Sequence, residues 1–228
     1  MIKLQNRLKT AADLVACGGV CIDIGSDHAY LPAYLISEGI CTRGIAADIG
    51  QLPLQNARAT LCRYGLLDKI ELRLSDGLDA FSPKDGDEII IAGMGGTLIT
   101  DILSRAPWLK DSSKHLILQP MTHSEEVRRF LSQNDFYIEE ERAVCDEGRC
   151  YNVISARYSP DKEICKTEGF YYIGRLAELD SDEAKIIINK QIKRVKSRIE
   201  GLRSCGRLPD ELAQLETAYE ELKHYENC

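Results

Sequence analysis

Strand-like apolar segments alternate with helix-like segments over the first 160 residues, and this alternation limits the possible folds more than any other feature. The apolar segments GVCIDIG, RGIAADI, IELRLSD, DEIIIAG and KHLILQP occupy residues 19–25, 43–49, 70–76, 87–93 and 114–120. Helical patterns cover residues 3–16, 30–38, 54–64, 97–104 and 124–133. Strands that alternate with helices predict right-handed crossovers and a mainly parallel sheet covered on both faces.

Two further strand-like segments end this pattern. FYIEEERAVCD (136–146) and CYNVISARY (150–158) follow each other across Glu147 and Gly148, with no helix between them. They predict an antiparallel hairpin at one side of the sheet. Seven strands in this order are typical of class I methyltransferases rather than of dehydrogenases, so we expect an α/β, Rossmann-like, seven-stranded domain of that class over residues 1–160.

The remaining residues, 161–228, have a purely helical pattern. Apolar residues recur at alternating steps of four and three residues from Ile188 and again from Leu208. CGR (205–207) supplies a short turn between the two runs, and Pro209 fits the first turn of the second helix. We expect an α-helical antiparallel coiled-coil domain. The short turn favours pairing within one chain, so we also expect a monomer.

The charge distribution indicates a polyanionic partner. The chain carries a net charge of −7, yet residues 184–208 hold eight basic residues against Glu200 alone. Such a patch on an acidic protein is typical of phosphate binding, although a solvated helix face would have the same composition. The candidate nucleic-acid contacts in this segment and at the N-terminus are Lys3, Arg7, Lys190, Lys193, Arg194 and Arg198.

The stretch DIGSDHAYLP, residues 23–32, indicates which cofactor binds at the ends of the predicted strands. Asp23 and Gly25 end the first strand, and Asp48 ends the next one, 23 residues beyond Gly25. This outline holds an adenosine ribose in both NAD and S-adenosylmethionine folds. A pyrophosphate would be repelled by Asp27, which stands where dinucleotide enzymes have glycine, whereas S-adenosylmethionine brings an ammonium and a sulfonium. Asp27 therefore favours the methyl donor, although an Asp at this position can also cap the following helix.

Later strand ends supply the other expected donor contacts. LSDGLDAF places Asp76 where a carboxylate can accept a hydrogen bond from an adenine amino group, although an Asp-Gly turn has the same sequence. AGMGG (92–96) lacks bulk, so a ligand can approach its backbone. The complete set of expected donor-binding residues is Asp23, Gly25, Asp27, Asp48, Ile49, Asp76, Gly77, Ala92, Gly93 and Met94.

Several classes of protein are disfavoured. No apolar stretch approaches the roughly 20 residues of a membrane span, and the N-terminus lacks the features of a signal peptide, so we expect a cytoplasmic protein without a membrane partner. The nine cysteines are odd in number and form no CxxC motif. We therefore expect free thiols, no disulfide framework and no metal site.

With DIGSDHAYLP, AGMGG and LILQP in this order, followed by EGRCYNVI and a helical hairpin, the chain resembles the bacterial tRNA (adenine-22-N1)-methyltransferase family, TrmK. The resemblance covers essentially the whole chain. It implies a class I methyltransferase domain with a C-terminal coiled coil that uses S-adenosylmethionine to methylate N1 of a tRNA adenine. The family usually reads Gln-Pro-Asn after the fifth strand, whereas Met121 replaces the Asn here.

The chemistry of this reaction selects the candidate catalytic residues. Adenine N1 carries a lone pair and needs no deprotonation, but its methylated product is a cation, so negative potential near the base assists transfer. Asp27 could supply that potential or bind the ammonium of the donor. His28 and Tyr30 could position or stack on the base, or only bond the loop and pack. Gln119 could read the adenine edge through its amide.

Three rival functions share parts of this pattern. A methyltransferase for another RNA, a small molecule or a protein would leave the basic segment as a solvated face. A Rossmann-like NAD enzyme is disfavoured by Asp27 and by the terminal hairpin. A non-enzymatic RNA-binding or coiled-coil scaffold would have no need of acidic residues at three successive strand ends.

Overall fold

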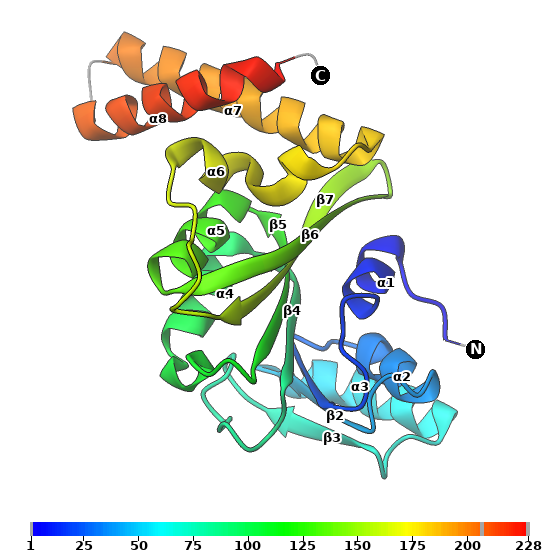
Figure 1. The fold of residues 1–228 in the computed structure, drawn as a ribbon. Coiled ribbons are helices and arrows are strands. Elements are labelled where there is room, and N and C mark those ends of the chain that lie inside the picture. Colours follow the sequence, from blue (N-terminus) through cyan, green and yellow to red (C-terminus); the bar gives the residue numbers. More distant parts are fainter. Residues whose placement is uncertain (1, 206–207, 227–228) are drawn as a thin grey trace.

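The computed structural model describes residues 2–205 and 208–226, and one seven-stranded sheet forms its centre (Figure 1). The strand order is β3-β2-β1-β4-β5-β7-β6. Neighbours from β3 to β5 pair in parallel, whereas β7 is antiparallel to both β5 and β6, which confirms the predicted terminal hairpin. The strands are β1 (Val20–Ile24), β2 (Arg43–Asp48), β3 (Ile70–Leu74), β4 (Glu88–Gly95), β5 (His115–Thr122), β6 (Phe136–Asp146) and β7 (Arg149–Tyr158).

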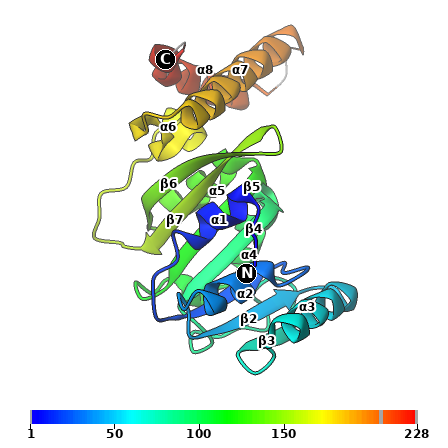
Figure 2. The same cartoon turned by 90° about the vertical axis from the view of Figure 1, so that its right-hand side faces the viewer.

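Helices cover both faces of this sheet, as the alternating pattern predicted. Successive side chains of a strand point to opposite faces, so Ile89 and Ile91 of β4 enter one hydrophobic core and Ile90 enters the other. The first core is closed by α4 (Gly96–Ser104), η1 (Pro107–Leu109) and α5 (Ser124–Gln133). The second is closed by α1 (Asn6–Ala12), α2 (Tyr30–Ser37) and α3 (Gln51–Tyr64). The N-terminal helix is therefore shorter than the predicted 3–16, and it lies across the sheet in Figure 2.

The C-terminal part is helical and has its own core. It consists of α6 (Glu168–Ile173), η2 (Gly174–Glu178), α7 (Asp182–Cys205), α8 (Pro209–Leu222) and η3 (Lys223–Tyr225). In Figures 1 and 2, α7 and α8 lie side by side and run in opposite directions. The predicted apolar positions of α7 are buried, but Leu208 is 55% exposed because it precedes α8 in a left-handed conformation. Most of the predicted CGR turn, residues 206–207, lies outside the described residues.

The sequence pattern did not reveal α6, which lies between the sheet and the helical pair (Figure 1). This helix has only six residues, too few for a periodic apolar pattern to be recognised. Its N-cap is Thr167, a residue type that favours helix starts, and the Thr167 hydroxyl accepts a hydrogen bond from Phe170 N at 3.3 Å.

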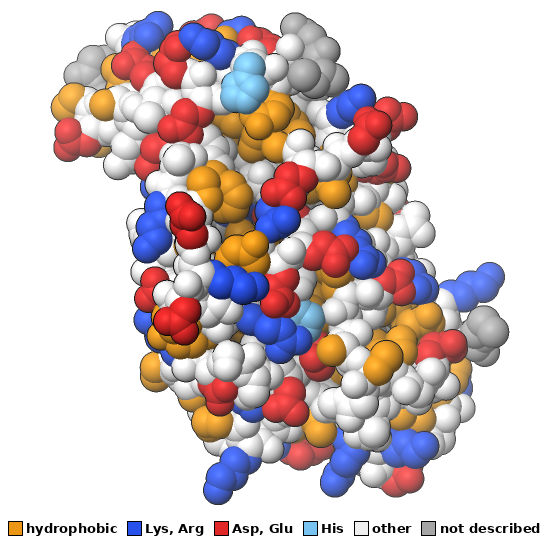
Figure 3. Space-filling model, in the orientation of Figure 1, with side chains coloured by type: hydrophobic (Ala, Val, Ile, Leu, Met, Phe, Trp, Pro, Cys, Tyr) orange, Lys and Arg blue, Asp and Glu red, His pale blue; other side chains and the backbone are white. Residues whose placement is uncertain are grey.

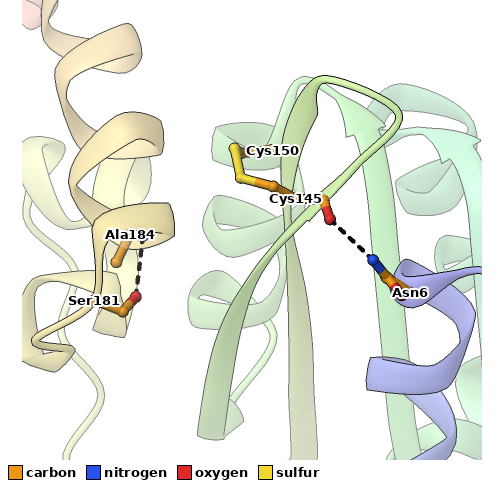
Figure 4. The surroundings of a disulfide bond; sticks show 5 residues. All are labelled: Asn6, Cys145, Cys150, Ser181 and Ala184. Atoms are coloured by element: carbon orange, nitrogen blue, oxygen red, sulfur yellow. Dashed lines mark hydrogen bonds between the residues drawn. A yellow bond between two sulfur atoms is a disulfide. The ribbon is translucent and has the colours of Figure 1, made fainter.

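Cys145 and Cys150 form a disulfide (Figure 4), so the expectation of free thiols alone was wrong. The two cysteines are directly paired in the register of β6 and β7. The turn predicted at Glu147 and Gly148 folds the strands back on each other, and this places residues five apart on facing positions. Elsewhere in the described chain, free thiols are present at Cys17, Cys21, Cys41, Cys62 and Cys165.

Within residues 2–205 and 208–226, no helix is both long enough and apolar enough to cross a bilayer. In the same ranges, no group of three or more His, Cys, Asp or Glu side chains is arranged to hold a metal ion.

Candidate active site

A cavity of about 420 Å³ lies where β1 and β4 end, beneath the N-terminal segment. Its volume falls in the range of small-molecule sites. Segments far apart in the sequence meet here, namely residues 3–8, the loop after β1 and the end of β4. Of the residues predicted from the sequence, it brings together Lys3, Arg7, Asp23, Gly25, Asp27, His28, Tyr30, Ala92 and Gly93.

The loop after β1 is held against the neighbouring strand. Gly25 N and Ser26 N both donate to the carbonyl of Ala47, at 2.8 and 2.9 Å. Gly25 has a φ of +76°, and an added Cβ there would lie 2.2 Å from the Met94 methyl group. The left-handed backbone conformation therefore favours glycine, whereas the Met94 methyl group ends a flexible side chain and could shift to admit a Cβ. Met94 itself packs against the core and is not among the residues that line the cavity.

Asp23 is a buried carboxyl group in the wall of this cavity, 7% exposed. Burial raises the pKa of Asp23 to about 7; the hydrogen bond from the Ser26 hydroxyl opposes this rise, and the nearby Asp48 charge adds to it. A cationic ligand group beside Asp23 would favour its charged form.

Asp27, His28 and Tyr30 form the exposed rim of the cavity. The Asp27 side chain is 60% exposed, and its Oδ2 lies 3.3 Å from His28 Nε2. Its other oxygen accepts a hydrogen bond from Asn56 Nδ2 at 3.3 Å. The rings of His28 and Tyr30 stack with centroids 5.4 Å apart.

The helix-capping alternative for Asp27 is not supported by the structure. The N-cap residue of α2 is Ala29, in a left-handed conformation with a φ of 53°, and no side chain caps the helix. The Asp27 carboxylate consequently faces the rim, where a ligand can reach it.

The expected contacts after β2 and β3 lie outside the cavity lining, beside it along the same edge of the sheet. Parallel strands end at a common edge, and the strand order places the ends of β2 and β3 next to that of β1. Asp48 Oδ1 accepts a hydrogen bond from Gly50 N at 2.8 Å, while Ile49 is 70% exposed. Asp76 pairs with Arg105 at 3.1 Å.

Gly77 has a structural reason to be glycine. Its φ is +55°, and an added Cβ would lie 2.7 Å from the Ile102 side chain. This accounts for the Asp-Gly turn without a ligand.

Gln119 is fully buried and does not line the cavity. Its Oε1 accepts hydrogen bonds from Gly93 N at 3.1 Å and from Arg7 Nη1 at 3.2 Å. Its Nε2 donates to the Pro120 carbonyl at 3.2 Å and to Met121 Sδ at 3.5 Å. Both ends of the amide are thus engaged within the protein, and Gln119 holds the cavity wall together.

The basic residues of α7 differ in how they are paired. Arg194 forms an ion pair with Glu125 of α5, and Arg198 pairs with Glu211 of α8 at 2.8 Å. Figure 3 accordingly shows basic and acidic side chains interspersed over the C-terminal helices. Lys190 and Lys193 form no ion pair within the described residues and line a separate surface groove with Asp182 and Glu226. None of the four predicted tRNA contacts in α7 lines the cavity, so the structure does not bring them together with the donor site. They are Lys190, Lys193, Arg194 and Arg198.

The contribution of the N-terminal segment to the cavity was largely missed. Leu4, Gln5 and Leu8 line it, as do Ser26, Ala29 and Leu31. Leu4 and Leu8 are four residues apart and pack against the second core. Their spacing gave the predicted helix, but no sequence signal indicates which part of the sheet that helix covers.

Comparison with known proteins supports the same kind of site. Residues 4–154 match the model of a family described as "Methyltransferase domain". The tRNA (adenine(22)-N(1))-methyltransferase of Bacillus subtilis is 37% identical over 155 residues, which are 68% of this chain and 65% of that enzyme. The aligned stretch is therefore slightly less than two thirds of the relative's length.

Solved structures resemble this one over nearly its whole length. The B. subtilis m1A22 tRNA methyltransferase TrmK superposes with a TM-score of 0.86 and 29% identity, covering 99% of both chains. A putative tRNA (m1A22) methyltransferase of Streptococcus pneumoniae, in complex with S-adenosyl-L-methionine, gives a TM-score of 0.73 and 28% identity over 96% of this chain and 97% of that one.

Proposed function

The chain belongs to the methyltransferase domain family, and from this premise we propose that it transfers a methyl group from S-adenosylmethionine to N1 of an adenine in tRNA. The TrmK resemblance identified in the sequence is confirmed by the comparisons, and adenine 22 is the position that they favour. The observation that carries the proposal is the cavity at the ends of β1 and β4, which gathers the DIGSDHAYLP loop and the AGMGG turn around one space.

The cavity residues fit the methyl donor. Asp23 and Asp27 supply carboxylates for a cationic ligand, and Gly93, which has no side chain, presents its backbone in the cavity lining beside them. Asp48 and Ile49 extend this surface toward β3, where we place the ribose and the base of the donor. S-adenosylmethionine supplies an activated methyl group on a sulfonium. The loop after β1 has Asp27 where a pyrophosphate-binding loop has glycine, which disfavours a dinucleotide.

The exposed rim is suited to the target base. The stacked His28 and Tyr30 rings offer an aromatic surface for an adenine. The Asp27 carboxylate beside them supplies negative potential where the methylated ring becomes positive, so it stabilises the transition state more than the neutral base. The protein needs no general base for this reaction, because N1 presents its own lone pair. Gln119 acts indirectly by fixing Gly93 and Arg7.

The helical part is proposed to hold the tRNA. We assign residues 1–160 to the methyltransferase domain and 161–228 to a coiled-coil domain, with α7 and α8 as its two arms. Lys190 and Lys193 are the α7 residues best placed to bind phosphates, because they have no acidic partner within the described chain. A tRNA substrate places the proposed activity in the cytoplasm, and we expect the protein to act as a monomer.

The direct test is methyl transfer from labelled S-adenosylmethionine to unmodified tRNA, followed by nucleoside analysis. We expect 1-methyladenosine in the product and its loss by at least about 100-fold in Asp27→Ala. The matched control is Glu38→Ala, which deletes an exposed carboxylate at the C-terminal end of α2 and should retain activity.

The outcomes separate the rival functions. Donor binding without methylation of any tRNA would overturn the proposal and direct the search to another RNA or a small molecule. A methylated nucleoside other than 1-methyladenosine would retain the tRNA substrate but contradict the assigned position of the methyl group.

A further inference from the structure

Arg7 brings a guanidinium from the N-terminal helix into the cavity that we assign to the methyl donor. Its Nη1 donates to Gln119 Oε1 at 3.2 Å, and its Nη2 donates to Gln5 Oε1 at 3.0 Å. Nη1 also lies 3.2 Å from the position that a Cβ on Gly93 would occupy. The side chain is therefore fixed beside the end of β4, inside the cavity rather than on an outer surface.

The charge of this guanidinium is not compensated. Both oxygens that accept its hydrogen bonds belong to neutral amides, and within the described residues no carboxylate pairs with it. Arg105 shows the contrast, because it pairs with Asp76, Asp79 and Asp101. A half-buried guanidinium held only by neutral acceptors keeps its capacity to bind an anion, and its planar shape matches a carboxylate.

The loop after β1 brings the opposite charge to the same cavity. Asp23 and Asp27 come from the loop after β1, whereas Arg7 comes from α1, and all three line the same space. A ligand that satisfies both the carboxylates and the guanidinium carries a positive and a negative group a short distance apart. The amino-acid end of S-adenosylmethionine is such a group, with an ammonium and a carboxylate on one carbon.

Resting on the proposed function, we infer that Arg7 binds the α-carboxylate of the methyl donor and that Gln119 positions Arg7 for this contact. The assignment differs from the sequence-based expectation that Arg7 contacts tRNA. Lys3 is the other basic residue with a long side chain in the cavity lining, but it is exposed and forms no hydrogen bond within the described chain, so it lacks the fixed geometry of Arg7.

The test compares two ligands that differ only in the carboxylate. Dissociation constants are measured by calorimetry for S-adenosylhomocysteine and for its decarboxylated analogue, with the wild type, Arg7→Gln, Arg7→Lys and the control Arg43→Gln. Arg43 is an exposed arginine at the beginning of β2 and does not line the cavity. We expect Arg7→Gln to weaken S-adenosylhomocysteine by about 10- to 100-fold and to leave the decarboxylated analogue within about 2-fold of wild type. Arg7→Lys should recover part of the loss, and Arg43→Gln should resemble wild type.

Two results would overturn the inference. Equal weakening of both ligands by Arg7→Gln would mean that the substitution disturbs the cavity without a carboxylate contact. Unchanged S-adenosylhomocysteine affinity with weakened tRNA binding would return Arg7 to the tRNA. If the folded wild type bound neither ligand, the proposed function itself would fail, and this outcome is distinct from both.

Discussion

Arg128 of α5 and Glu141 of β6 form a fully buried, bidentate ion pair, and the same arginine also contacts the C-terminal part. Arg128 Nε and Nη2 each lie 2.8 Å from a Glu141 carboxylate oxygen, and neither side chain is exposed. The remaining Nη1 donates to the carbonyls of Tyr171 and Tyr172, at 3.0 and 2.9 Å. One side chain of α5 thus holds an edge strand and the short helix α6 together.

Arg128→Met is expected to lower the free energy of unfolding by about 3–5 kcal/mol, because it leaves the Glu141 carboxylate buried without a partner and two carbonyls of α6 without a donor. Urea unfolding followed by circular dichroism measures this loss. The double variant Arg128→Met/Glu141→Leu should recover part of it, since no buried charge remains.

Arg142→Met is the control for this comparison. Arg142 and Glu140 form an ion pair whose side chains are 37% and 49% exposed, so its loss should cost less than about 1 kcal/mol. Equal destabilisation by the two substitutions would contradict the role assigned to Arg128.

Asp23 predicts a pH dependence of stability for the protein without donor. Because burial raises the pKa of Asp23 to about 7 in the folded state, the folded protein holds a proton that the unfolded chain, with an ordinary pKa of 3.8, has released. Stability should therefore fall as the pH rises from about 4 to about 7 and then level off. Asp23→Asn, which stays neutral, should remove this dependence.

The measurement is a series of urea midpoints between pH 5 and pH 8. Asp68→Asn, at an exposed carboxylate, serves as the matched control and should follow the wild type. If the wild-type and Asp23→Asn midpoints ran parallel over this range, Asp23 would not be the group responsible.

The sheet and its helices could be predicted because they depend on local patterns. The apolar segment 87–93 predicted a strand, and the steps of four and three residues from Ile188 predicted a helix with one buried face. Neither prediction needs tertiary information, and the structure confirms both, as β4 and α7. The short helix α6 was missed because its contacts are tertiary: its carbonyls are held by Arg128, more than 40 residues earlier in the chain.

The candidate site was predictable in its loop but not in its hydrogen bonding. The stretch DIGSDHAYLP predicted that Asp23 and Asp27 contribute carboxylates to a ligand site, and both side chains line one cavity. Gln119 looked free to read a base, yet its amide is occupied by Arg7 and Gly93, which lie 112 and 26 residues away. Likewise, the Glu125 partner of Arg194 is 69 residues distant. Such pairings follow from the packing of elements, which sequence periodicity does not specify.

The Cys145–Cys150 disulfide predicts a stability that responds to reductant. It closes a short loop across the β6–β7 hairpin, for which the chain-entropy model gives about 2 kcal/mol. We expect a reductant to lower the melting temperature of the wild type but not that of Cys145→Ser/Cys150→Ser.

Because Asn6 of α1 donates to the Cys145 carbonyl at 3.4 Å, reduction should also loosen the N-terminal segment (Figure 4). Hydrogen exchange of α1 in the oxidised and reduced protein measures this effect. Cys62→Ser, at an exposed free thiol, is the control and should keep the response of the wild type to reductant. A melting temperature indifferent to reductant in the wild type would contradict the prediction.

The two unpaired lysines of α7 supply the final prediction. Arg194 and Arg198 are engaged by Glu125 and Glu211, so a tRNA phosphate would have to displace an ion pair to reach them. Lys190 and Lys193 carry no such cost. Lys190→Glu/Lys193→Glu should therefore weaken tRNA binding by at least about 10-fold at moderate salt and reduce the slope of log affinity against log salt by roughly 2.

Donor affinity should be unchanged in this variant, because neither lysine lines the donor cavity. The control variant Lys84→Glu/Lys110→Glu makes the same change of charge close to where β4 and β5 begin. The cavity, in contrast, lies where β1 and β4 end. A filter-binding titration at several salt concentrations compares the two variants. If both lost the same affinity, the effect would be one of net charge, and α7 would not be the surface that holds the tRNA.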